Sequence, residues 1–130
     1  MIKKFKISVS NKKINQIYSK VKKYPWNDIK KLDGWTHGTN HKYLKEFSKY
    51  WTSKFNWKKQ EKKINNFSNY ITKVDNINLH FIKENGSGKN PTPLLILHGW
   101  PGSIVEFLDI IKKLAHPEKY GARKEHAFDV

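Results

Sequence analysis

The chain has 130 residues, with 26 Lys and Arg against 11 Asp and Glu, and no Cys. This length suits one compact domain rather than two full ones, and the lack of Cys excludes a disulfide framework, a thiolate nucleophile and a Cys-ligated zinc site. About a quarter of the residues are Leu, Ile, Val or Phe, which exceeds the roughly 20% below which strongly charged chains stay disordered. We therefore expect a folded protein with a modest core.

The net charge of +15 is concentrated in the first half of the chain, where residues 1–63 carry 18 Lys and four acidic residues. A basic region can bind nucleic acid, an anionic membrane surface or an acidic partner. However, Arg123 is the only Arg, whereas sites that grip phosphate or guanine favour Arg. The abundance of Lys, Asn and Ile also follows an A/T-rich codon bias. We expect no nucleic-acid partner, and we keep a basic nucleic-acid-binding protein as an alternative.

The apolar segments are too short to cross a membrane. The aliphatic run near the middle, Leu94–Leu97, has four residues, against the roughly 20 that a spanning helix needs. In the first ten residues, Phe5, Ile7 and Val9 alternate with polar residues, which predicts a strand rather than a secretory signal. We expect a soluble, cytoplasmic protein without a transmembrane segment.

Helical periodicity dominates residues 10–68. Ser10 and Asn56 are suitable N-caps for a first and a third helix, and a second, strongly amphipathic helix is predicted from Asn40 to about Lys54. Residues 24–39 are irregular and rich in Gly and Trp, which favours a loop held by its tryptophans. The apolar positions at helical spacing are Ile14, Ile17, Tyr18 and Val21, then Tyr43, Leu44, Phe47, Tyr50 and Trp51, then Trp57, Ile64 and Phe67.

The pattern changes to α/β after residue 68. Ile71–Val74 and Ile77–Ile82 predict a hairpin that turns at Asp75-Asn76. A polar loop rich in Gly and Pro follows, and then Leu94–Leu97, whose apolar character predicts a strand buried on both faces of a sheet.

The predicted strand leads into the turn His98-Gly99-Trp100-Pro101-Gly102-Ser103 and then into a helix. Ser103 and Glu106 have the spacing of a capping box. Backbone amides held at the carboxyl end of a sheet can stabilise a negative oxygen in a transition state, and Gly99 and Gly102 allow close approach to a substrate. An ordinary strand-to-helix turn with a tryptophan packed on it explains the same spacing.

This hexapeptide resembles the HGWPGS oxyanion-hole motif of α/β-hydrolases of the epoxide hydrolase family, of the microsomal and juvenile-hormone type. Upstream residues are similar to the N-terminal domain of that family: Gly34-Trp35, Gly38-Thr39, Tyr43-Leu44, Tyr50-Trp51, Phe55-Asn56-Trp57, Gln60-Glu61, Asn65 and Phe67. The resemblance covers essentially the whole chain. It implies an α/β fold in which a helical N-terminal region, residues 1–68, leads into an incomplete α/β-hydrolase core, residues 69–130.

The resemblance also implies the chemistry. The family adds water to an epoxide, without a cofactor, through an ester on an aspartate nucleophile, and the product is a vicinal diol. Carried over by position, the Trp100 N–H is an oxyanion donor, the Trp100–Pro101 peptide is cis, and His98, Gly99 and Gly102 belong with them to the turn and pocket.

No residue of this sequence matches the nucleophile, the catalytic histidine, its acid or the lid tyrosines of the family. Asp109 and Asp129, on a predicted helix and at a strand start, lack the nucleophile's setting. We therefore expect residues 1–130 to be inactive alone and to partner the remainder of the hydrolase core or a like subunit. The alternative is a non-catalytic interaction module left by truncation.

A metal site is not expected. His37 and His41 are four residues apart, as zinc-binding histidines on one helix can be, but no Glu lies between them and no third ligand is evident.

Overall fold

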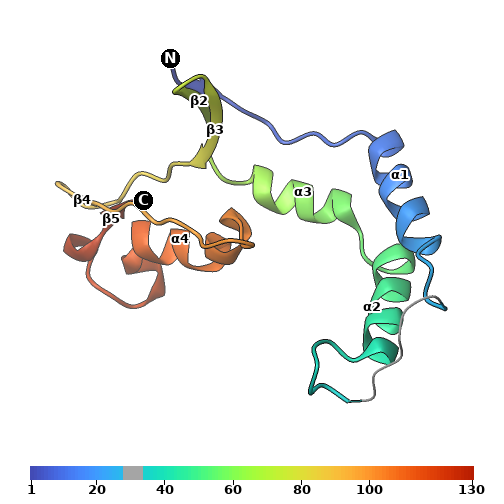
Figure 1. The fold of residues 1–130 in the computed structure, drawn as a ribbon. Coiled ribbons are helices and arrows are strands. Elements are labelled where there is room, and N and C mark those ends of the chain that lie inside the picture. The colour runs from blue at the N-terminus through green and yellow to red at the C-terminus, as the bar shows by residue number, and fades with distance from the viewer. Residues whose placement is uncertain (28–33) are drawn as a thin grey trace. The chain divides into compact units, whose positions relative to one another are not determined.

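The computed structural model describes residues 1–27 and 34–130. The chain forms two compact units: residues 8–60, here called the helical unit, and residues 1–7 with 61–130, here called the mixed unit. Figure 1 shows the elements of both. The loop predicted over residues 24–39 lies partly outside the described residues.

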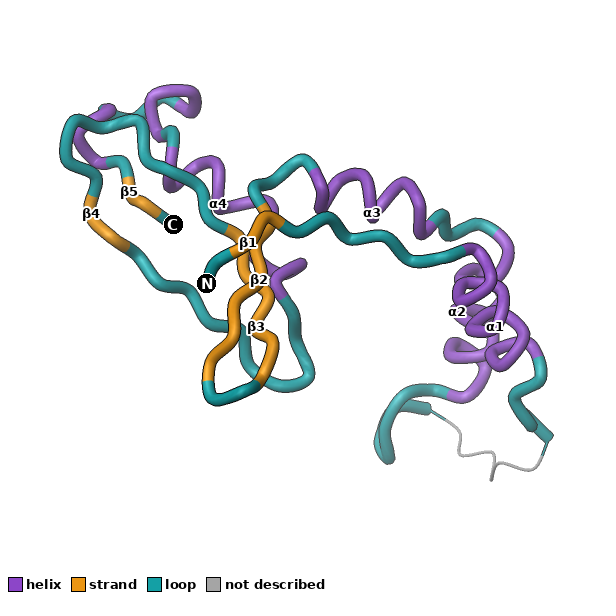
Figure 2. The backbone as a smooth tube through the Cα atoms, turned by 90° about the horizontal axis from the view of Figure 1, so that it is seen from above, coloured by secondary structure: helices purple, strands orange, loops and turns teal. Residues whose placement is uncertain are grey.

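The helical unit contains α1 (Asn11–Lys22) and α2 (His41–Ser53), which lie side by side (Figure 2), and the start of α3 (Trp57–Asn65). The three predicted helices are confirmed. Each helix begins where a side-chain oxygen accepts a hydrogen bond from a first-turn backbone amide that has no acceptor inside the helix. The bonds are Lys13 N to Ser10 Oγ at 3.2 Å, Tyr43 N to Asn40 Oδ1 at 3.0 Å, and Lys59 N to Asn56 Oδ1 at 3.0 Å.

The mixed unit holds an antiparallel sheet in the order β1 (Lys3–Lys4), β2 (Asn69–Val74), β3 (Ile77–Ile82). The predicted hairpin is confirmed, and its turn residues Asp75 and Asn76 have φ of 47° and 64°, as a type I′ turn requires. The strand predicted over residues 1–10 is mostly wrong, because only Lys3 and Lys4 form a strand. β2 begins at Asn69, which Phe5 N contacts, so the residues after Phe5 have no strand residue of β2 to pair with. Ile7 instead exchanges hydrogen bonds of 2.9 and 2.8 Å with the Asn65 side chain.

The predicted strand Leu94–Leu97 also needs correction. The strand is β4 (Thr92–Pro93), which pairs in parallel with β5 (Phe128–Asp129). The ladder ends where Leu94 N donates to Asp129 O at 2.8 Å. Burial on both faces is wrong as well, because Leu95 and Leu97 are 82% and 78% exposed.

The predicted helix after Ser103 is confirmed, although its first turn is a 3-10 turn, η1 (Ile104–Phe107), which continues as α4 (Leu108–Ala115). Two short 3-10 turns follow, η2 (Pro117–Tyr120) and η3 (Lys124–His126). In the described residues, the buried apolar side chains are Ile64, Leu108, Ile111, Ala115, Pro117 and Ala127. In the part of the chain that the structure describes, no helix has the length and apolar character needed to cross a bilayer.

Candidate functional site

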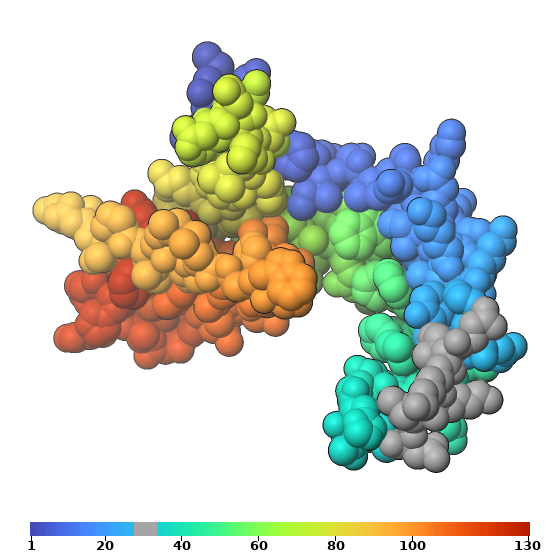
Figure 3. Space-filling model, in the orientation of Figure 1, coloured from blue at the N-terminus to red at the C-terminus, as the bar shows by residue number. Residues whose placement is uncertain are grey.

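The turn His98–Ser103 connects β4 to η1 and lies at the surface of the mixed unit, where the chain around residue 100 is orange in Figure 3. The Trp100–Pro101 peptide is cis, as the resemblance implies. Gly102 N donates to Gly99 O at 2.6 Å, which closes the turn, and Trp100 is 96% exposed.

A capping box fixes the far end of the turn. The Ser103 hydroxyl accepts from Val105 N at 3.3 Å, and the Glu106 carboxylate accepts from Ser103 N at 3.3 Å. A Cβ on Gly102 would lie 2.8 Å from Gly99 O and 2.7 Å from Glu106 Cδ, closer than real Cβ atoms come. This position therefore requires glycine.

The Trp100 amide has no acceptor among residues 1–27 and 34–130. It lies between an apolar segment whose first residue, Leu94, donates to Asp129 O and a helix that begins with a capping box. An exposed, pre-oriented N–H can stabilise a developing oxyanion. His98 has no carboxylate partner in the described residues, and its Nδ1 lies 3.3 Å from Gly99 O.

An apolar groove of about 310 Å³ runs beside this segment, between β3 and residues 94–98, with Ile104, Phe107, Ile111 and Val130 completing its lining. His80, on β3, lies in the groove and places Nε2 3.0 Å from Asn69 Oδ1. Because the Asn69 amide nitrogen donates to Ile64 O and Phe67 O, Oδ1 is the acceptor and His80 Nε2 carries the proton. Burial lowers the pKa of His80, which favours this neutral form.

Neither the role of His80 nor the groove was predicted from the sequence. The alternation of Ile77, Leu79 and Phe81 with polar residues was the available signal, but it does not say which other segment faces the strand.

The two aspartates have other partners. Asp109 forms an exposed ion pair with Lys63, with Oδ1 and Nζ 3.2 Å apart, and Asp129 Oδ1 accepts from Gly86 N at 2.7 Å. His41 Nε2 lies 3.2 Å from Trp26 O, and His37 is exposed. Within the described ranges, no three His, Cys, Asp or Glu side chains are grouped closely enough to hold a metal ion.

A family model described as "Epoxide hydrolase N terminus" matches residues 2–107. The chain belongs to this epoxide hydrolase family. Epoxide hydrolase 1 of Oryctolagus cuniculus is 35% identical over 99% of this chain and 29% of the relative, and a putative epoxide hydrolase of Stigmatella aurantiaca is 32% identical over 97% and 29%.

Among solved structures, juvenile hormone epoxide hydrolase from the silkworm Bombyx mori superposes with a TM-score of 0.82 and 28% identity, and covers 99% of this chain and 30% of that one. The Aspergillus niger epoxide hydrolase, at 24% identity and a TM-score of 0.72, shows the same fold. The α/β class, as the first part of an α/β-hydrolase, is therefore confirmed. The chain spans about 29% of the length of these curated epoxide hydrolases, and the border predicted between residues 68 and 69 stays a prediction.

Proposed function

We propose that this chain is the N-terminal part of an epoxide hydrolase and supplies one oxyanion-hole donor, the Trp100 N–H. The observation that carries the proposal is the exposed Trp100 amide without an acceptor in the described residues, in a turn closed by Gly102 N and Gly99 O and fixed by the Ser103–Glu106 capping box. Family membership supplies the reaction: an epoxide and water give a vicinal diol.

In the proposed mechanism, an aspartate carboxylate attacks an epoxide carbon, the ring C–O bond breaks and the ring oxygen takes up a proton, which gives a hydroxy ester. Water then attacks the ester carbonyl and releases the diol and the aspartate carboxylate. The Trp100 N–H donates to the oxygen that becomes negative in this second step, and one such donor lowers the barrier by about 3 to 4 kcal/mol. Gly102 keeps the turn narrow, Gly99 supplies the carbonyl that closes it, Pro101 shapes it, and His98 begins it without acting as a base. The Trp100 ring lines the substrate pocket.

The nucleophile and the water-activating histidine come from elsewhere, in the remainder of the hydrolase core or a like subunit. Both aspartates that follow the turn support this, because Asp109 is paired with Lys63 and Asp129 with Gly86 N. The helical region 1–68 and the core segment 69–130 contribute together to the complete enzyme.

A chimera tests the proposal. Residues 1–130 replace the equivalent part of the silkworm enzyme, and diol formation from styrene oxide is measured. We expect the chimera to turn over and residues 1–130 alone to be inactive. Trp100→Pro, which removes the N–H, should lower kcat about a hundredfold or more.

Trp100→Phe keeps the N–H and should lose far less activity than Trp100→Pro. Circular dichroism and the melting temperature show whether each variant is folded. The proposal is wrong if a folded parent chimera has no turnover, if the folded Trp100→Pro chimera keeps its kcat, or if residues 1–130 alone form diol and lose that activity on Asp109→Ala or Asp129→Ala.

A further inference from the structure

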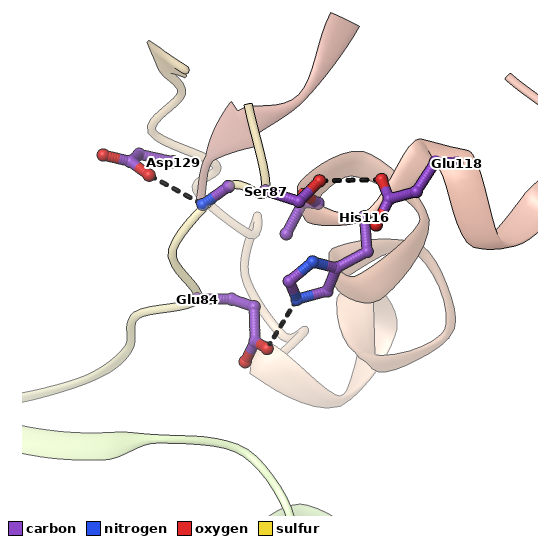
Figure 4. Close-up of polar contacts among 7 residues, drawn as sticks. Glu84, Ser87, His116, Glu118 and Asp129 are labelled. Atoms are coloured by element: carbon purple, nitrogen blue, oxygen red, sulfur yellow. Dashed lines mark hydrogen bonds and ion pairs between the residues drawn. The ribbon is translucent and has the colours of Figure 1, made fainter. Parts of the chain in front are cut away.

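Polar contacts gather around residues 84–87, some distance along the chain from the oxyanion turn. Glu84, Gly86 and Ser87, here called the 84–87 clamp, contact both β5 and the end of α4 (Figure 4). The contacts are Gly86 N to Asp129 Oδ1 at 2.7 Å, Ser87 N to Ala115 O at 2.9 Å, Ser87 Oγ to Glu118 Oε2 at 2.7 Å, and His116 Nε2 to Glu84 Oε1 at 3.2 Å.

The clamp is connected to the segment before the turn through β5. Glu84 and Val130 exchange two backbone hydrogen bonds, of 2.8 and 2.9 Å. The neighbouring residue Asp129 accepts from Leu94 N at 2.8 Å. Leu94 begins the apolar segment that leads to the turn, so the contacts that hold Glu84 against β5 also bear on the first residue of that segment.

The clamp is connected to the helix after the turn through His116. This residue is the C-cap of α4, and its side chain and that of Glu84 are only 20% and 19% exposed. A hydrogen bond shielded from water in this way is stronger than one at the surface. The Glu118 carboxyl lies close enough to His116 and Lys119 to feel their charge, and a hydrogen bond from Ser87 lowers the pKa of that carboxyl.

Close packing leaves the clamp little room to move. A Cβ on Gly86 would lie 2.5 Å from Pro91 Cβ and 2.8 Å from Phe128 O. The loop backbone therefore lies directly against β5, and the Gly86 N–H reaches the Asp129 carboxylate in a short, charge-assisted hydrogen bond.

These contacts connect the two sides of the turn. From the turn, the chain continues into α4 and its C-cap His116; His116 contacts Glu84, Glu84 pairs with β5, and β5 binds Leu94, from which the chain leads back to the turn. We propose that Glu84 is a positioning residue, which fixes the two flanks of the oxyanion turn relative to each other and so sets the direction of the Trp100 N–H. This inference rests on the proposed function only for the role of that N–H. Glu84 acts through β5 and α4, without contact with a substrate.

Amide hydrogen exchange and chemical shifts of the ¹⁵N-labelled chain test the inference. Glu84→Ala removes the acceptor for His116. We expect the Leu94 amide to exchange about tenfold faster and the Trp100 and Gly102 amide signals to shift. Glu84→Gln keeps an acceptor oxygen without the charge and should retain most of the protection. If only the charge of Glu84 mattered, Glu84→Gln and Glu84→Ala would lose protection equally.

Glu118→Gln is the matched control, because Glu118 binds Ser87 in the same loop but does not contact β5. It should leave Leu94 exchange within about twofold. If Glu84→Ala does not fold, His116→Ala, which removes the ring that meets Glu84, decides the question with the same readout. The inference is wrong if the folded Glu84→Ala or His116→Ala variant leaves the Leu94 and Trp100 amides unchanged, or if Glu118→Gln changes them equally.

The two proposals fail separately. The exchange experiment measures the position of the turn and not turnover, so a chimera that keeps its kcat after Trp100→Pro overturns the donor role and leaves the clamp intact. Unchanged Leu94 and Trp100 amides overturn the clamp and leave the donor role intact.

Discussion

Gly99 and Gly102 belong to the same turn but differ in the space around them. A side chain on Gly102 would meet the Gly99 carbonyl and the Glu106 carboxylate, whereas nothing lies within 4 Å of a Cβ on Gly99. Glu106 is not free to move aside without loss, because it caps η1.

For these single residues, we predict that Gly102→Ala lowers the free energy of unfolding by about 2 kcal/mol, through overpacking and loss of the capping box. Gly99→Ala should change it by less than about 0.5 kcal/mol. Urea unfolding of both variants measures the difference. Equal midpoints for the two variants would contradict the geometry described for the turn.

At the scale of the element, the β2–β3 hairpin depends on a turn with two left-handed residues, Asp75 and Asn76. Asn adopts positive φ more readily than other residues that carry a side chain, and Gly adopts it without a steric penalty. The register then pairs Val74 with Ile77 and continues to Asn69 and Ile82.

We therefore predict that Asn76→Ala destabilises the hairpin by about 1 kcal/mol, while Asn76→Gly is at least as stable as the parent. Denaturant unfolding gives the free energies, and exchange of the β2 and β3 amides shows whether the loss is local to the hairpin. If Asn76→Gly proves the weaker variant, backbone conformation is not what selects Asn here.

At the scale of the whole molecule, the apolar segment after β4 is exposed. Leu95 and Leu97 are more than three-quarters exposed and lie beside the groove lined by β3. An unpartnered apolar edge of this kind promotes association with other chains.

We predict that residues 1–130 self-associate in a concentration-dependent way and that Leu95→Thr with Leu97→Thr weakens this association. Sedimentation velocity measures it. Ile77→Thr is the control, because Ile77 is also exposed, at 70%, but does not line the groove. If Ile77→Thr weakens association as much as the Leu95→Thr, Leu97→Thr variant does, the chains associate through a surface other than the one at Leu95 and Leu97.

Local signals in the sequence were sufficient for much of the fold. The caps at Ser10, Asn40 and Asn56, the capping box at Ser103, and the hairpin turn at Asp75-Asn76 all depend on hydrogen bonds or dihedral angles within a few residues. Such interactions can be read directly from residue spacing. The HGWPGS turn, together with the tryptophan and glycine pattern upstream, was equally sufficient to indicate the family.

The features that could not be predicted depend on partners distant in the chain. β4 begins at Thr92 and its ladder ends at Leu94 because β5 supplies hydrogen bonds only that far. His116 meets Glu84 across 32 positions, and His80 contacts Asn69 because β3 places the two side chains together. The caps at Ser10, Asn56 and Ser103 and the hairpin turn could be predicted from residue spacing because their hydrogen bonds and dihedral angles are local, and the family could be predicted from its motifs. The position of the strand, the groove and the 84–87 clamp required the folded chain, because their hydrogen bonds and packing come from segments that no local pattern brings together.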